Sequence, residues 1–229
     1  MSTRWQFDAT ICALALVALI AWDMSGLDLA LVRMYADASG FPLRGHWVMT
    51  SIFHEGGRNL TALMLVLLLI NIWRPVWFAR QLTRRDRVWW FGASVTCLLI
   101  APSLKQLSLT SCPWSLAEFG GTAQYLSHWA IGQRDGGPGG CFPSGHAAGA
   151  FCFVAGWYIL RSSAPKAARW WLGITLLAGV VFGWSQMMRG AHYVSHFLWT
   201  AWFCLSMTAV MYHCLSKWRD SPGAAQREN

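Results

Sequence analysis

Long apolar segments, each close to the length that crosses a lipid bilayer, limit most strongly what this chain can fold into. Only 12% of its 229 residues are charged, and 55% are hydrophobic. A helix rises about 1.5 Å per residue, so about 20 residues cover about 30 Å of hydrocarbon. The sequence therefore predicts an all-α integral membrane protein with six transmembrane helices. The predicted spans are residues 9–32, 59–73, 88–104, 146–160, 170–188 and 193–216.

One domain accounts for the chain. We predict a single six-helix transmembrane domain over residues 1–219 and a disordered tail over residues 220–229, where Ser, Pro, Gly, Gln and Glu replace apolar residues. The first span, which carries Asp23 and Asp28, has the alternative interpretation of a signal peptide. Asp8 interrupts the basic start that a signal peptide needs, and no small-residue cleavage site follows the apolar run, so we count it as a span.

The basic residues predict the orientation, because cytoplasmic loops carry an excess of Lys and Arg. Six spans place both termini on one side, which we predict to be the cytoplasmic side of a bacterial inner membrane. The segments on that side hold Arg4, Arg74, Arg80, Arg84, Arg85, Arg87, Arg161, Lys166, Arg169, Lys217, Arg219 and Arg227. The outer segments hold Arg33, Arg44, Arg58, Lys105, Arg134 and Arg189. This topology explains most of the net charge of +8, so no nucleic-acid partner is predicted.

A Gly-rich turn before the fourth span leads into a candidate phosphate-binding nest. Pro143 suits the first turn of a helix, and Ser144 and Gly145 leave free backbone donors at the positive end of the helix dipole. An anion binds readily there. His146, one residue further on, can donate a proton to the oxygen that leaves a bound phosphate. The alternative is a simple helix cap followed by an interfacial histidine.

The short loop between the fifth and sixth spans holds three basic side chains. If this stretch begins the sixth helix, spacings of three and four residues put Arg189, His192 and His196 on one face. The planar guanidinium suits phosphate oxygens, and a neutral imidazole is a competent nucleophile toward phosphorus. Each group alone could merely reach the membrane interface, but several ionisable groups at one membrane face indicate a functional site.

Other outer residues can join this site. Lys105, at the outer end of the third span, would add a point charge, or it could serve only as a snorkelling anchor. Outside the second span, Arg58 could add a second guanidinium, and Glu55 could orient a histidine. We therefore predict an active site formed by outer-face loops and helix ends.

These residues resemble the type 2 phosphatidic acid phosphatase superfamily, whose signature is K-x6-R-P, then P-S-G-H, then S-R-x5-H-x3-D. The middle motif is complete at residues 143–146. The first motif has Lys105 and Pro113 at the expected spacing, but Cys112 stands in the place of the arginine.

The third motif keeps its histidine, His192, and departs from the pattern at two other positions. Gln186 takes the arginine slot and His196 takes the aspartate slot. Arg189 could substitute for the displaced arginine. The order of the motifs and the six-span layout agree with the superfamily over most of the chain.

The resemblance implies a lipid phosphatase, a hydrolase that needs no metal and no cofactor. His192 would attack phosphorus to give a phosphohistidine, His146 would protonate the leaving oxygen, and water would cleave the intermediate. Phosphoryl oxygens would be held by Lys105, Ser144, Gly145 and Arg189.

In the superfamily an aspartate fixes the tautomer of the nucleophilic histidine. His196 can do so only when its facing nitrogen is unprotonated. Glu55, Glu118 or Asp135 could supply a carboxylate instead.

Two of the seven cysteines, Cys112 and Cys141, fall in the long outer loop next to motif prolines. We predict a disulfide between them if the outer side is an oxidising periplasm, and two free thiols otherwise. The remaining cysteines lie in predicted spans and are interpreted as small packing residues.

Several functions remain open at this stage. The leading one removes a terminal phosphate from a lipid headgroup or a polyprenyl diphosphate, and a close variant transfers the phosphoryl group to another lipid hydroxyl. A transport protein could instead bind an anion or lipid through Arg58, Lys105 and Arg189 without covalent chemistry. A metal site is a further alternative, although the basic residues would repel a cation; its ligands would come from His54, His128, His146, His192 and His196. The sequence leaves the lipid and the oligomeric state open.

Overall fold

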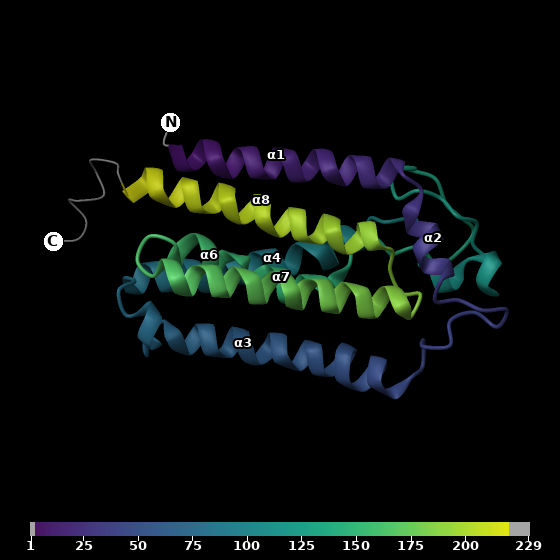
Figure 1. The fold of residues 1–229 in the computed structure, drawn as a ribbon, viewed down its shortest axis with the longest axis horizontal. Coiled ribbons are helices and arrows are strands. Elements are labelled where there is room, and N and C mark those ends of the chain that lie inside the picture. The colour runs from purple at the N-terminus through teal and green to yellow at the C-terminus, as the bar shows by residue number, and fades with distance from the viewer. Residues whose placement is uncertain (1–2, 220–229) are drawn as a thin grey trace.

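Helices lie side by side along one long axis in the computed structural model, which describes residues 3–219 (Figure 1). Within these residues the regular elements are all helical. The α-helices are α1 (Thr3–Met24), α2 (Leu27–Arg33), α3 (Gly57–Asn71), α4 (Arg84–Lys105), α5 (Gly145–Phe151), α6 (Ala155–Leu160), α7 (Pro165–Met188) and α8 (Val194–Arg219). Shorter helical turns are η1 (Val48–Gly56), η2 (Trp77–Ala79), η3 (Pro113–Ser115), η4 (Ala117–Phe119) and η5 (Cys152–Val154). The start of α1 and the end of α8 lie at the same end of the bundle (Figure 1).

Five helical segments within residues 3–219 are long and apolar enough to cross a membrane. These are α1, α3 with its preceding turn η1, α4, α7 and α8. The sixth predicted span corresponds to α5, η5 and α6, a shorter apolar segment over Gly145–Leu160. The all-helical membrane architecture is therefore as predicted, whereas the count of six spans remains a prediction. The predicted tail at 220–229 lies outside the described residues.

The first predicted span, 9–32, is wrong at its outer end. The helix stops at Met24, and Gly26 adopts a left-handed conformation with φ of 70°, which residues with a side chain rarely adopt. The chain then turns into the short helix α2. Residues 48–58 were predicted as an outer loop, but they form the π-helical turn η1 and the start of α3. Gly56 and Gly57 both have ordinary right-handed helical dihedrals.

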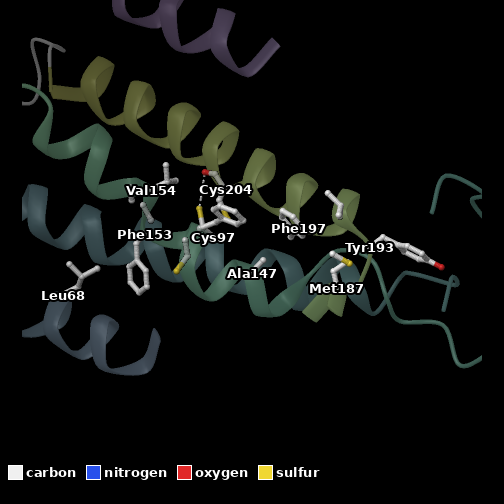
Figure 2. Packing of buried hydrophobic residues seen from close by; sticks show 14 of the residues in the cluster. Leu68, Cys97, Ala147, Phe153, Val154, Met187, Tyr193, Phe197 and Cys204 are labelled. Carbon is white, nitrogen blue, oxygen red and sulfur yellow. Dashed lines mark hydrogen bonds between the residues drawn. The ribbon is translucent and has the colours of Figure 1, made fainter. Parts of the chain in front are cut away.

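Phenyl rings packed against glycines bring α5 and α8 close to α7. A Cβ atom added at Gly179 of α7 would lie 2.1 Å from the Phe151 ring of α5. A Cβ atom at Gly183 would lie 2.3 Å from the Phe197 ring of α8. Small residues allow such close approach between membrane helices. Figure 2 shows Phe197 packed in the apolar interior near Ala147 and Met187, so these contacts fix the helix ends that carry the predicted site.

A buried ion cluster joins the helices near the opposite end of the bundle. The carboxylate of Asp8 in α1 accepts two hydrogen bonds from Arg161, each 2.7 Å long, and lies 2.7 Å from Nε2 of His213 in α8. Asp8 interrupts the apolar run of α1 because it pairs with the ends of α6 and α8. A buried pair of this kind is costly to break when only one partner is removed.

Candidate active site

The predicted site residues come from helix ends and connections. Lys105 is the last residue of α4, and Ser144 directly precedes α5. Arg189 and His192 lie in the connection from α7 to α8, and His196 lies in α8, three residues before Trp199. The structure therefore assembles the three sequence motifs from four helices and their connections.

His192 lies in a buried and basic environment. Only 5% of its surface is exposed. Burial, followed by the charges of Lys105 and His146, lowers the pKa of His192 to about 3. The imidazole is therefore neutral at physiological pH, which is the form that can attack phosphorus.

This depressed pKa predicts how stability depends on pH. A histidine in the unfolded chain titrates near pH ~6.5, so below that pH the unfolded state binds a proton that folded His192 rejects. The stability is full above this range and falls as the pH drops toward about 3. We expect the midpoint of thermal unfolding in detergent to fall between about pH 7 and about pH 5 in the parent, and to fall less in His192→Gln. The exposed His46 provides the control His46→Gln, which should behave like the parent; an equal fall in all three proteins would contradict the assignment.

His196 stands four residues after His192, where the resemblance places the superfamily aspartate. Its Nδ1 atom lies 3.3 Å from Nδ1 of His192. The Nδ1 atom of histidine and a carboxylate oxygen of aspartate are separated from Cβ by the same number of bonds, so both side chains present an acceptor at the same place. If Nδ1 of His192 carries the proton, His196 accepts it, and Nε2 of His192 keeps its lone pair for attack.

The nest before α5 is tied to α8. The Ser144 backbone N–H donates to the His196 carbonyl at 3.2 Å, and the Thr200 hydroxyl donates to the Ser144 carbonyl at 3.1 Å. The Ser144 hydroxyl is fully buried and has no hydrogen-bond partner within the described part of the chain. A Cβ atom at Gly145 would meet no atom within 4 Å, so there is open space beside this helix start. An unpaired buried donor next to open space fits a bound anion oxygen.

His146 is held between two rings. It stacks on His54 with ring centroids 4.9 Å apart and on Phe182 at 4.8 Å. Its Nε2 atom lies 3.0 Å from the Phe53 carbonyl oxygen, which can only accept, so Nε2 carries a hydrogen. The Nδ1 atom is then the ring nitrogen available to a leaving oxygen.

Arg189 is oriented by the residue in the lost arginine slot. Its guanidinium donates to the Gln186 side-chain oxygen at 3.1 Å and to the Arg44 carbonyl at 3.1 Å. Gln186 is buried, with 3% of its surface exposed. Arg189 has five N–H donors, so this arrangement leaves others for a ligand.

The other predicted residues take varied places. Arg58 and Glu55 are exposed, and their charges act on His54, as do those of Lys105 and Arg189. Two carboxylates predicted as alternatives are engaged elsewhere. Glu118 pairs with Arg33, and Asp135 binds the hydroxyl of Ser111 at 2.9 Å and the backbone N–H of Gly137 at 3.0 Å.

A disulfide lies against the nucleophile candidate. The Cys112 and Cys141 sulfurs are 2.12 Å apart, and Sγ of Cys141 is 3.8 Å from Nδ1 of His192. The donor atoms of these three residues lie within 4.8 Å of one another, the spacing of a metal-ligand group. Metals bind cysteine as thiolate, and sulfurs joined to each other are not thiolates. In the disulfide form this group is therefore a cross-link between the first and second motifs.

Breaking this cross-link should destabilise the fold. The bond joins residues 29 positions apart, and closing a loop of that size contributes about 3–4 kcal/mol in the chain-entropy model. We expect Cys112→Ser with Cys141→Ser to lower the thermal unfolding midpoint in detergent and to reduce activity, and a dithiol reductant to do the same to the parent. Cys214→Ser, at an exposed free cysteine, is the matched control. An unchanged midpoint in the double variant would contradict the cross-link.

Sequence reasoning gave no role in the site to Asp23 or Asp28, and it considered His128 only as a ligand of an alternative metal site. Asp28 of α2 accepts hydrogen bonds from the Ser195 backbone N–H at 2.9 Å and from the Ser195 hydroxyl, so it caps the start of α8. Asp23 and His128 lie close together behind His196. The sequence did contain a signal for the two aspartates, because acidic residues within an apolar membrane segment are costly and indicate a functional site. They were interpreted only as interruptions of a span.

An all-helical integral membrane protein with a basic, histidine-rich site built from helix ends is the class that this fold and site define. Comparison with known proteins narrows it. The model of the PAP2 superfamily matches residues 87–220 of the 229, and the chain therefore belongs to the PAP2 superfamily.

Among solved structures, the chain is similar to the crystal structure of the first transmembrane PAP2 type phosphatidylglycerolphosphate phosphatase from Bacillus subtilis. The TM-score is 0.55 at 19% sequence identity, and the alignment covers 92% of this chain and 96% of that one. A search of curated proteins found no match. The predicted family is thus confirmed, and the fold is that of a transmembrane PAP2 phosphatase.

Proposed function

We propose that this protein is a membrane lipid phosphatase that removes a terminal phosphate from a lipid headgroup or a polyprenyl diphosphate. The observation that carries the proposal is the unpartnered, buried hydroxyl of Ser144 beside the open space at Gly145. The same region holds the neutral imidazole of His192, on which the ammonium of Lys105 acts.

The reaction follows from the roles of these groups. Nε2 of His192 attacks phosphorus, and the bond from phosphorus to the lipid oxygen breaks as His146 protonates that oxygen. For this step His146 must be in its imidazolium form, in which Nε2 keeps its hydrogen toward the Phe53 carbonyl and Nδ1 gives up its proton. Lys105, Arg189 and the donors of Ser144 and Gly145 stabilise the charge that builds on the phosphoryl oxygens. Water then gives a proton to Nδ1 of His146 and attacks the phosphohistidine, the bond from phosphorus to His192 breaks, and inorganic phosphate leaves with both histidines restored. No step calls for a metal ion.

An apolar groove supports a lipid substrate. A groove of about 320 Å³ lies between α3, α5 and α7, and its lining includes Leu60, Met64, Ile174 and Phe182. The Phe182 ring that lines it also stacks on His146. A hydrocarbon chain in this groove would place its headgroup near the proton donor.

Phosphate release from a panel of lipid phosphates tests the proposal. The panel should contain phosphatidylglycerolphosphate, phosphatidic acid and a polyprenyl diphosphate, each presented to detergent-purified protein with and without a chelator. Release that survives the chelator supports the proposal. Transfer of phosphate to an added lipid alcohol would identify a phosphotransferase, and binding without release or transfer would overturn the proposal in favour of a transport or binding protein.

A further inference from the structure

A carboxylate lies behind His196, although the third motif lacks one. Oδ2 of Asp23, at the end of α1, lies 3.5 Å from Nε2 of His128. The side chains are buried, with 7% of His128 and 8% of Asp23 exposed. The His128 ring in turn packs edge to face against His196, with ring centroids 5.6 Å apart. These residues continue the line that begins with the 3.3 Å contact between His196 and His192.

The surroundings keep this carboxylate in place. The indole N–H groups of Trp129 and Trp199 donate to Oδ2 of Asp23 at 2.8 and 2.9 Å. The other oxygen, Oδ1, is buried and has no hydrogen-bond partner within residues 3–219, and the same is true of Nε2 of His128, so the 3.5 Å contact between Asp23 and His128 is an electrostatic one. The His128 ring is stacked on Phe142 with centroids 4.2 Å apart and an angle of 4°, which fixes its plane. Two donors and a rigid neighbour hold the acid toward the histidines.

His196 needs such a group. When His192 attacks phosphorus, its ring gains positive charge, and the proton on Nδ1 is drawn toward His196. The titratable groups that face His196 are His192, His128, Lys105 and Tyr193, and the Cys141 carbonyl also acts on it, but none of these is an anion at neutral pH. A buried positive charge without an anion is costly.

We propose that Asp23 supplies, through His128, the negative charge that the third motif lacks at position 196. Asp23 and His128 are positioning residues in this scheme: they act on His196, which fixes the tautomer of His192 and shares its positive charge. No bond is made or broken at Asp23. The inference rests on the proposed function, because it assigns a role in the attack by His192.

The inference is tested by making the substitution Asp23→Asn in two proteins, the parent and the variant His196→Asp. Asp23→Asn removes the charge and keeps the shape and an acceptor for both indoles. We expect it to lower kcat on the order of 10- to 100-fold with KM nearly unchanged, less than direct loss of a catalytic aspartate costs. The variant His196→Asp restores the motif carboxylate four residues after His192. In that variant Asp23→Asn should change kcat less than about twofold, because the charge that Asp23 supplies through His128 is then no longer needed. Asp37→Asn, at an exposed acid of the outer side, is the matched control.

Two other kinetic results would overturn the inference about Asp23. An equal loss in both proteins means that Asp23 only supports the fold, and no loss in the parent means that it has no role; either result overturns the inference. If His196→Asp proves inactive, histidine-selective 15N NMR of the parent and Asp23→Asn replaces the kinetic comparison. Altered ring-nitrogen shifts of His196 and His192 would support the inference, and unchanged shifts would refute it. A parent that releases no phosphate from any substrate refutes the proposed function instead, and the NMR comparison still tests the contact.

Discussion

Replacing His192 with glutamine is expected to reduce phosphate release from the preferred lipid by roughly 10⁴-fold or more, because removal of a catalytic nucleophile leaves only binding and electrostatic help. Glutamine fills a similar volume and can still donate a hydrogen bond to His196, whose Nδ1 atom lies 3.3 Å from Nδ1 of His192. The loss should therefore appear in kcat. The measurement is phosphate release under saturating substrate, together with rapid-quench capture of an alkali-stable phosphohistidine.

Capture of the phosphohistidine identifies the nucleophile more directly than the rate of phosphate release does. Parent protein should carry label from a labelled lipid phosphate, and His192→Gln should carry none. His46→Gln, at an exposed histidine, should match the parent in both assays. A labelled His192→Gln protein would show that another residue is the nucleophile.

Replacing His146 with alanine should have the next largest effect, and the effect should depend on the leaving group. Loss of a general acid costs roughly 10²- to 10⁴-fold when the leaving oxygen is basic, as in a lipid alcohol. An aryl phosphate with an acidic leaving group needs no proton, so its hydrolysis should fall far less. The measurement compares kcat/KM of the variant for the two substrate types.

The stacked rings make a control available. His54→Phe keeps a ring against His146, whose centroid is 4.9 Å from that of His54, and should preserve the difference between leaving groups that the parent shows. An equal loss of both activities in His146→Ala would contradict the role of proton donor. It would indicate instead that His146 helps to hold the phosphate.

The sequence was sufficient to predict the helical membrane fold and the family, because each depends on local pattern. Apolar length predicts spans, and the residues of motif 143–146 and the histidine pair lie close together along the chain. The position of Cys112 and Cys141 beside the motif prolines likewise suggested the pairing that the structure shows.

Other features depend on contacts between distant segments, which local pattern does not reveal. The break at Gly26 turns α2 back so that Asp28 reaches Ser195, 167 positions later in the chain. The position of Asp23 beside His128 likewise depends on how the long outer loop folds over α1. Arg189 was predicted to replace the missing arginine, and the contact that orients it, from Gln186, became visible only in the folded chain.

The contact between Asp28 and the start of α8 limits where this protein can be cut into fragments. Residues 87–220, matched by the family model, contain the three motifs, yet Asp28, which accepts hydrogen bonds from the backbone N–H and the hydroxyl of Ser195 at the start of α8, lies in α2 outside that range. A fragment with every motif residue would leave these donors of α8 unsatisfied next to His196. The motif region is therefore a recognisable part of the enzyme without being a transferable one, and grafts between relatives should carry α1 and α2 together with α8.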